Sequence, residues 1–323
     1  MLTSASLGEL YENLLSFPWP IVRYRFEWTV TRAMYLPDYA GSAFRGAFGR
    51  ALRRTSCMTH MSECQHCPLY RSCPYTMIFE TPAPMTHSLQ KFSKIPNPYV
   101  IEAPDWGRRS YQPGDKLSFS IVLIGKALYH LPLVIYALQK AFLKDVVHGT
   151  ANLNGVFCFN SQEGEQLIYS PSYSQVLEHS QTLRLSNIFK PMSVAKMRFL
   201  TPLRIQENGL ALSAERLTTD KILMTLCRRL GLLLELQSHS QFIIPFVELK
   251  ALAQTCEIEK DLYWQDWVRY SSRQQQKMHL GGVMGSLELS HLPEIFSLFL
   301  YIGQWVHFGK NTSFGLGQYV LEK

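Results

Sequence analysis

The chain has 323 residues, of which 46% are hydrophobic and 18% charged, a composition that predicts one or two well-packed domains and excludes a disordered protein. Its net charge of +7 and pI near 9.0 favour a polyanionic partner, although many proteins this basic bind nothing acidic. The most apolar stretch, residues 121–138, is interrupted by Lys126 and Pro132, and the N-terminus carries acidic residues where an export signal needs basic ones, so we expect a soluble, cytoplasmic protein.

The first half of the chain predicts one cycle of strands and helices. Residues 19–36 alternate large apolar and polar side chains and predict a strand. Residues 40–54 predict an amphipathic helix with four arginines on its polar face, and the close approach of another backbone would explain its Gly46 and Gly49. The other expected elements are strands at 99–104 and 115–125, a helix at 131–144, and strands near 152–159 and 165–170.

The second half predicts a similar cycle. The expected elements are a strand at 195–205, helices at 215–236 and 245–257, a glycine-kinked strand at 277–290, a helix at 292–306 and a closing strand at 315–323. Two such cycles predict an α+β protein with tandem ferredoxin-like (RRM-like) βαββαβ domains, at 1–190 and 191–323.

Four of the seven cysteines are clustered, and this cluster is the strongest local motif. The spacing C-x6-C-x2-C-x5-C lets four thiolates converge on one ion, which predicts a structural Zn2+ knuckle inserted in the first domain, formed by Cys57, Cys64, Cys67 and Cys73. An iron–sulfur cluster is the alternative to zinc, and His60 or His66 could replace one of the four ligands. The interpretation without a metal is that the four cysteines are reduced thiols on the surface. The remaining three cysteines lie among apolar neighbours and are expected to be buried and unreactive.

Residues 305–319, WVHFGKNTSFGLGQY, form a glycine-rich ending. Glycines let a main chain approach a phosphodiester closely and offer it N–H donors, so Gly309, Gly315 and Gly317 predict a nucleic-acid contact. Lys310 adds a positive charge, while Phe314 and Tyr319 either stack on bases or pack inward. The alternative is a glycine-rich hairpin that caps the core.

Three segments together resemble a known family. They are GSAFRGAFGRALRR followed by the cysteine cluster, DWVRYSSRQ with LGGVMGSL, and the glycine-rich ending. The chain is similar to the CRISPR precursor-RNA-processing endoribonucleases of the RAMP superfamily, in the subgroup with a cysteine knuckle in the first domain. The resemblance implies two ferredoxin-like domains, a glycine-rich loop that contacts RNA, cleavage of CRISPR repeat RNA without a metal, and other CRISPR effector-complex subunits as possible partners.

Metal-independent cleavage uses the RNA's own 2′-hydroxyl as the nucleophile. It needs a general base, a general acid and cations beside the phosphate, and it leaves a 2′,3′-cyclic phosphate and a 5′-hydroxyl. The resemblance implies a catalytic histidine on or near the first helix, but residues 40–54 contain none. We therefore expect His307 to be the acid or base, with a buried histidine under the loop as the alternative, Lys310 and Arg273 as charge stabilisers, and Tyr39 or Tyr270 as an auxiliary group.

The candidate RNA-binding residues lie in three segments. The arginine face of the first helix and the segment 269–277 would contact phosphates, with Tyr270 stacking on a base, although a solvated surface has the same composition. The RNA-binding candidates are Arg45, Arg50, Arg53, Arg54, Arg269, Tyr270, Lys277, Gly309, Asn311, Ser313, Phe314, Gly315 and Gly317.

Two other functions compete with this interpretation. The first is a RAMP-type subunit that binds processed guide RNA without cleaving it. The second is a metal-dependent DNA nuclease with an iron–sulfur cluster, for which APDW (103–106) and ELK (248–250) supply weak motifs.

Overall fold

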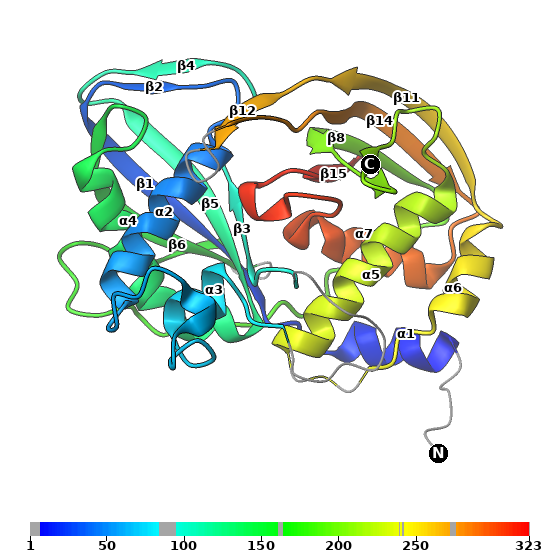
Figure 1. Cartoon of the computed structure of the whole chain (residues 1–323). Helices are drawn as coiled ribbons and strands as arrows, with labels where there is room; N and C mark the ends of the chain where they lie inside the picture. The colour runs from blue at the N-terminus through cyan, green and yellow to red at the C-terminus, as the bar shows by residue number, and fades with distance from the viewer. Residues whose placement is uncertain are drawn as a thin grey trace. The chain divides into compact units, whose positions relative to one another are not determined.

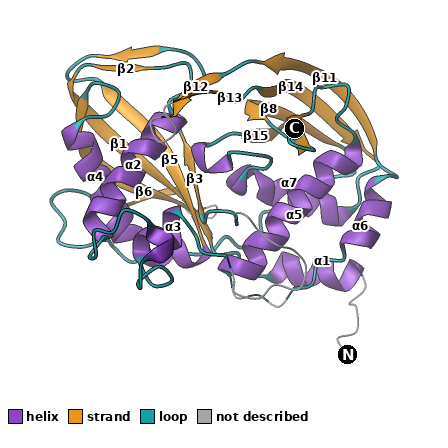
Figure 2. Cartoon of the chain, in the orientation of Figure 1, coloured by secondary structure: helices purple, strands orange, loops and turns teal. Residues whose placement is uncertain are grey.

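The computed structural model describes residues 7–83, 95–160, 164–238, 240, 242–271 and 276–322, and for residues 160, 269–271 and 276–279 it describes the backbone alone. Helices and antiparallel sheets share the chain, which confirms the predicted α+β class (Figures 1 and 2). No helix within the described ranges is long and apolar enough to cross a lipid bilayer.

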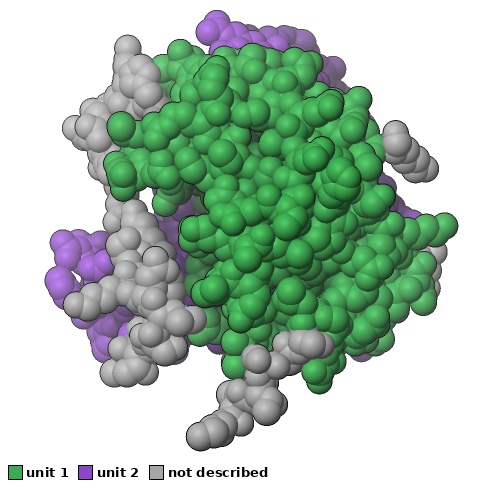
Figure 3. Space-filling view, turned by 90° about the vertical axis from the view of Figure 1, so that its right-hand side faces the viewer, with its two compact units in different colours: residues 1–19, 184–235, 239–323 green, residues 20–183, 236–238 purple. Residues whose placement is uncertain are grey.

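The chain divides into two compact units, coloured separately in Figure 3. The N-terminal unit comprises Pro20–Leu183 with Leu236–Ser238. The C-terminal unit comprises Met1–Trp19, Arg184–Glu235 and His239–Lys323, so the first residues of the chain belong to the unit formed by its last residues.

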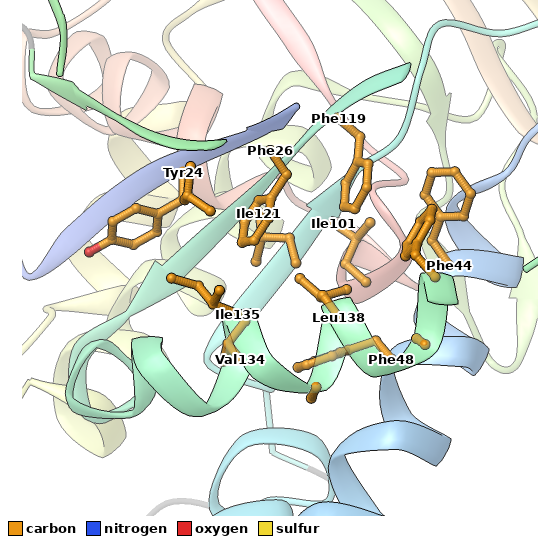
Figure 4. Close-up of a cluster of buried hydrophobic side chains, with 14 of the residues drawn as sticks. Tyr24, Phe26, Phe44, Phe48, Ile101, Phe119, Ile121, Val134, Ile135 and Leu138 are labelled. Carbon is orange, nitrogen blue, oxygen red and sulfur yellow. The ribbon is translucent and has the colours of Figure 1, made fainter. Parts of the chain in front are cut away.

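The N-terminal unit has a five-stranded antiparallel sheet in the order β3-β5-β1-β6-β7. Its elements are β1 (Ile21–Arg32), β2 (Met34–Leu36), α2 (Gly41–Ser56), η1 (Cys64–His66), α3 (Pro74–Phe79), β3 (Tyr99–Glu102), β4 (Arg109–Tyr111), β5 (Lys116–Ile124), η2 (Gly125–His130), α4 (Leu131–Lys144), β6 (Thr150–Asn160) and β7 (Gly164–Tyr169). Helices α2 and α4 pack side by side on one face of this sheet, as their rings at Phe44 and Phe142 show with centroids 5.4 Å apart (Figure 4).

The core of this unit follows from the alternation along β1. Tyr24, Phe26 and Trp28 are fully buried on the side that faces α2 and α4, as the sequence pattern predicts (Figure 4). The Trp28 ring stacks on Phe142 of α4 with centroids 4.3 Å apart. Stacked aromatic rings of this kind add about 0.5–1.5 kcal/mol to the burial of their surface, so they fix α4 on the sheet.

The C-terminal unit repeats the order strand, helix, strand, strand, helix, strand in a four-stranded antiparallel sheet, β11-β14-β8-β15. Its elements are α1 (Leu7–Ser16), β8 (Ala195–Leu203), β9 (Gln206–Glu207), β10 (Leu210–Ala211), α5 (Thr219–Gln237, which ends in the other unit), α6 (Phe246–Ala253), β11 (Glu257–Gln265), β12 (Val268–Ser271), β13 (Gln276–His279), β14 (Gly282–Ser290), α7 (Glu294–Val306), η3 (Thr312–Phe314) and β15 (Tyr319–Glu322). Neither α1 nor β11 is among the elements expected from the sequence.

The two glycines of α2 have different environments. A Cβ at Gly49 would lie 2.2 Å from Cζ of Phe79 in α3, whereas a Cβ at Gly46 would meet only the end of the flexible Arg50 side chain, at 3.4 Å. The expected close approach of another backbone is therefore wrong for both positions. Gly49 makes room for an aromatic ring, and this contact joins α3 to α2.

We predict opposite effects from the same substitution at these two positions. Gly49→Ala should destabilise the protein by about 1–3 kcal/mol, because the Phe79 ring must move out of its packed position. Gly46→Ala should stabilise it by about 0.5–1 kcal/mol, because alanine favours a helix without steric cost. Urea unfolding of both variants measures the difference, and equal effects would contradict this account of Gly49.

Candidate functional site

The glycine-rich ending folds back against the end of strand β8. Helix α7 ends at Val306, and the loop that follows returns the chain to β15. A Cβ at Gly309 would lie 2.7 Å from the carbonyl oxygen of Arg204, and a Cβ at Gly317 would lie 1.9 Å from that of Phe308. Both glycines have positive φ, of 90° and 71°, so the loop needs glycine for both backbone conformation and space.

The expectation that these glycines offer their N–H groups to a phosphodiester is wrong for most of the loop. The N–H of Lys310 donates to Arg204 O at 2.8 Å, that of Gly317 to Pro202 O at 3.0 Å, and that of Gly315 to Thr312 O at 2.7 Å. The hydroxyl of Thr201 donates to Gly315 O at 2.7 Å. The close backbone approach is therefore between the loop and β8, and it makes the loop rigid.

The two aromatic residues of this segment pack inward. Phe314 is 7% exposed and Tyr319 is 1% exposed, and the Tyr319 hydroxyl donates to Leu300 O at 2.5 Å. Burial raises the pKa of Tyr319 well above its usual value. Of the predicted contact residues in the loop, Lys310 is exposed and Gly309, Asn311 and Ser313 are partly exposed, so these four form the outer surface of the loop.

His307 lies at the base of the loop and has no exposed surface. It terminates α7 with φ 53° and ψ 172°, and its backbone N–H donates to Gly303 O at 2.8 Å. A side chain in this position cannot reach an RNA strand on the surface. The structure therefore favours the alternative interpretation of His307 as a buried residue that packs under the loop.

Sequence reasoning missed Arg229 of α5, which holds the end of α7. Its Nε donates to Val306 O at 2.8 Å, and the residue is 8% exposed. Burial lowers the pKa of its guanidinium to about 9. A cation at the C-terminal end of a helix interacts favourably with the helix dipole, so Arg229 stabilises the point from which the glycine-rich loop starts. No sequence pattern distinguishes it from its exposed neighbour Arg228.

Arg204 joins the glycine-rich loop to the segment that leads into β14, at one end of the C-terminal sheet. The carbonyl oxygen of Arg204 accepts a hydrogen bond from the N–H of Lys310 in the loop. The guanidinium of the same residue donates through Nη1 to Gly281 O at 2.5 Å. Gly281 immediately precedes β14, and the N–H of Leu280 donates to Trp267 O at 2.8 Å, next to the β12–β13 hairpin. Arg204 thus connects two segments that are far apart in the sequence.

The β12–β13 hairpin contains most of the remaining predicted RNA contacts. Its register places Tyr270 opposite Lys277 and Arg269 opposite Met278. The side chains of Arg269, Tyr270 and Lys277 are not described, and Arg273 lies outside the described residues. The roles of all four stay predictions, but the backbone places Arg269, Tyr270 and Lys277 on a paired hairpin at the same end of the sheet as Lys310.

The four arginines of α2 do not form one solvated face as predicted. The Arg45 guanidinium lies 4.2 Å from the centroid of the Phe79 ring. Arg53 Nη2 donates to the carbonyl oxygens of Met61 and Ser62, at 2.6 and 2.8 Å. Two of the four therefore hold α3 and the cysteine segment, and Arg50 and Arg54 are the exposed pair.

Tyr39, the predicted auxiliary proton donor, is 2% exposed and stacks on Trp106 with ring centroids 5.4 Å apart. Burial raises the pKa of its hydroxyl. This environment favours a packing role over contact with RNA.

The four clustered cysteines line a single small pocket together with Arg53 and Tyr75. All four are reduced, and burial raises the pKa of the Cys64 thiol. Within the part of the chain that the structure describes, however, no group of three or more histidine, cysteine or acidic side chains is placed to hold a metal ion. The predicted metal knuckle is therefore not supported as a formed site, because the segment directs the thiols to one pocket without bringing them within ligand distance of one ion.

Two family models match the chain in succession. Residues 197–319 match the CRISPR-associated endoribonuclease Cas6, so the C-terminal unit carries a domain of an RNA-cleaving enzyme family. Residues 17–182, just over half of the chain, match the family AF_1859_N, described as an N-terminal domain, and the chain belongs to this family. The first of these matches confirms the resemblance to the Cas6 family for the C-terminal unit.

One curated relative and several solved structures are similar to the chain. An uncharacterized protein of Archaeoglobus fulgidus is 25% identical over 290 residues, 88% of this chain and 91% of that protein. A Cas6 product complex has a TM-score of 0.56 at 14% identity, covering 94% of this chain and all of that one. Thermus thermophilus Cas6 has a TM-score of 0.52 at 15% identity, covering 95% of this chain and 99% of that one.

A chain of a partial Cas6-RT-Cas1–Cas2 complex has a TM-score of 0.56 at 18% identity. The match covers 96% of this chain and 47% of the other, so this chain spans about half of that protein. At these identities the solved structures show a shared fold.

We predict that Gly317 is far less replaceable than another glycine with the same backbone conformation. Gly317→Ala should destabilise the protein by about 3 kcal/mol or more, because left-handed strain adds to the clash with Phe308 O. Gly209 has φ 81°, close to the 71° of Gly317, but open space around its Cβ position, so Gly209→Ala should cost about 1 kcal/mol. Thermal and urea unfolding compare the two, and similar losses would show that strain alone explains Gly317.

Proposed function

We propose that this chain is an endoribonuclease that cleaves CRISPR repeat RNA without a metal ion, by attack of the 2′-hydroxyl on the adjacent phosphorus. The observation that carries the proposal is that the Cas6 match at 197–319 contains both the glycine-rich loop and the β12–β13 hairpin, which lie at the same end of the C-terminal sheet. The solved Cas6 product complex supports it as a structure with the same fold.

We also propose that the two units are tandem ferredoxin-like domains, one for each half of the sequence. Both have the order strand, helix, strand, strand, helix, strand, and in both sheets the first strand lies between the third and the fourth of that series. This repeated order supports the proposal. The main segment of one unit ends at Leu183, and the next residue, Arg184, belongs to the other unit.

Lys310 is the group that we assign to the scissile phosphate. It is exposed, and the hydrogen bond from its backbone N–H to Arg204 O fixes the point from which its side chain leaves the loop. An ammonium group beside the phosphate stabilises the negative charge that develops on phosphorus-bound oxygens during the attack. Arg273 and Tyr270 are proposed to assist from the neighbouring hairpin.

The alternative is a guide-RNA-binding subunit that does not cleave. The burial of His307 and Tyr39 favours this alternative, because the sequence predicts these residues as proton-transfer groups and neither side chain is accessible. The same cationic end of the sheet would then hold a processed RNA.

Cleavage assays with repeat RNA separate the two functions. We expect site-specific cleavage that survives EDTA and stops when the nucleotide at the cleavage site carries a 2′-deoxyribose, because the nucleophile is then absent. Lys310→Ala should lower the cleavage rate about 10- to 100-fold, and Lys250→Ala, at an exposed lysine of α6, should leave it unchanged.

Tight binding without cleavage would support the guide-binding alternative. Cleavage of DNA that depends on added magnesium would contradict both. A protein that cleaves equally well with Lys310→Ala would retain the proposed function and lose our assignment of the charge stabiliser.

The cysteine pocket is proposed to bind structural zinc. Four reduced thiols around one pocket are the donor set that tetrahedral Zn2+ prefers, and Arg53 already fixes the connecting segment through Met61 and Ser62. We propose that Cys57, Cys64, Cys67 and Cys73 hold the ion and that the thiols lose their protons on binding.

Zinc reconstitution of the full chain tests this assignment. One equivalent of Zn2+ should be retained after dialysis, with a rise in melting temperature, and Cys64→Ser should abolish both effects. Cys158→Ser, at a buried cysteine of β6, should retain zinc. A wild-type protein that retains no metal would contradict the proposal, and a brown protein with visible absorbance would indicate an iron–sulfur cluster instead.

A further inference from the structure

The outer surface of η2 and α4 carries exposed tyrosines between lysines. Tyr129 is 79% exposed and Tyr136 is 47% exposed. Lys140 and Lys144 are exposed beside them, and Lys126 is partly exposed. These five residues are called the α4 surface below. Large aromatic side chains normally contribute most by burial, so two that face solvent on one short segment need an explanation.

The opposite side of α4 accounts for its attachment to the protein. Val134, Ile135 and Leu138 point into the core against the sheet (Figure 4). Tyr136 and Lys140 are four residues apart on the other side of α4, and the exposed Tyr129 lies in η2, which immediately precedes the helix. The α4 surface is therefore not needed for packing of the N-terminal unit.

The charge of this region is of one sign. Residues 125–144 contain three lysines and no acidic residue, and the neighbouring helix α2 contains four arginines and no acidic residue. Because α2 and α4 cover the same face of the sheet, the exposed Arg50 and Arg54 add to the same cationic layer. A polyanion is the partner that this field attracts.

The tyrosines determine which kind of polyanion fits. The Lys140 Nζ lies 5.1 Å from the centroid of the Tyr136 ring, so a cation and an aromatic face are presented together. Unpaired bases stack on aromatic side chains while lysines follow the phosphates, whereas the bases of a duplex are stacked on one another and unavailable.

The open face of the C-terminal sheet carries both signs of charge, with acidic side chains in excess. Glu257, Glu259 and Asp261 alternate along the exposed edge strand β11, and Glu259 lies opposite Glu288 of β14. Strand β8 adds Lys196 opposite Glu288 and Arg198 opposite Ser286, so this face attracts RNA less than a surface of purely positive charge. The contrast indicates that RNA contacts are confined to particular surfaces of the chain.

We propose that the α4 surface is a second RNA contact, which binds an unpaired strand by stacking on Tyr129 and Tyr136. The inference rests on the proposed function, because it extends RNA binding from the glycine-rich loop and hairpin to a separate surface. Its role is to hold single-stranded RNA that lies outside the cleavage site.

Fluorescence anisotropy with the full chain and a 5′-labelled 15-nucleotide poly(U) RNA tests the stacking. The double variant Tyr129→Leu, Tyr136→Leu keeps apolar bulk and removes the aromatic faces, so we expect binding at least 10-fold weaker with an unchanged melting temperature. Tyr263→Leu is the matched control, at a tyrosine that is 56% exposed on the acidic sheet, and it should bind within 2-fold of wild type.

The salt dependence tests the lysines separately. The triple variant Lys126→Gln, Lys140→Gln, Lys144→Gln should reduce the slope of log affinity against log salt by about 2, since each phosphate contact on a single strand contributes about 0.7. A 15-base-pair RNA duplex should bind the tyrosine variant and the wild type equally, because its bases are not available for stacking.

Three results would overturn the inference. They are wild-type affinity of the tyrosine double variant for poly(U), an equal loss in the Tyr263→Leu control, and an equal loss for the duplex. If the α4 variants bind as wild type while wild-type protein cleaves repeat RNA, the inference fails and the proposed function stands. If the wild-type chain neither binds nor cleaves repeat RNA, the proposed function fails as well.

Discussion

The hydrogen bonds between the glycine-rich loop and the end of β8 determine the geometry of the whole candidate site. Lys310 and Gly317 donate their backbone N–H groups to Arg204 and Pro202, and this approach is possible because Gly309 and Gly317 carry no side chain. The same Arg204 reaches Gly281 beside the hairpin. A loop bound in this way fixes the backbone from which the exposed Lys310 side chain extends.

The net charge of +7 is distributed unevenly over the surfaces of the protein. Much of the excess lies on α2 and in residues 125–144, which contain no acidic residue, while the open face of the C-terminal sheet carries the acidic side chains of β11 and Glu288. A polyanion is therefore attracted more strongly to some surfaces than to others. Such patterning steers a long flexible RNA more effectively than a uniform positive charge of the same size.

Sequence periodicity predicted the fold better than the site. The alternation along β1 and the amphipathic patterns of α2 and α4 are strong because those elements bury one face on a large core. Strand β11 was missed because six of its nine residues are exposed, so EIEKDLYWQ shows no regular alternation of apolar and polar residues. The glycines of the loop correctly indicated a close backbone approach, but no local pattern reveals whether the approaching backbone belongs to RNA or to β8. The burial of His307 and the role of Arg229 depend on tertiary contacts that single-sequence reasoning does not contain.

For the proposed ribonuclease activity, the accessibility of His307 bears directly on the rate. RNA supplies its own nucleophile, so a protein that only positions the 2′-hydroxyl and neutralises the phosphate already accelerates the reaction, whereas proton transfer contributes a further factor of about 10²–10⁴. In the proposed mechanism Lys310 meets the first requirement from the glycine-rich loop, and neither His307 nor Tyr39 meets the second from inside the core. A slow enzyme and a guide-binding subunit thus differ by a single proton-transfer group. Tyr270 is the remaining predicted proton donor, and the β12–β13 hairpin places its backbone at the same end of the sheet as Lys310.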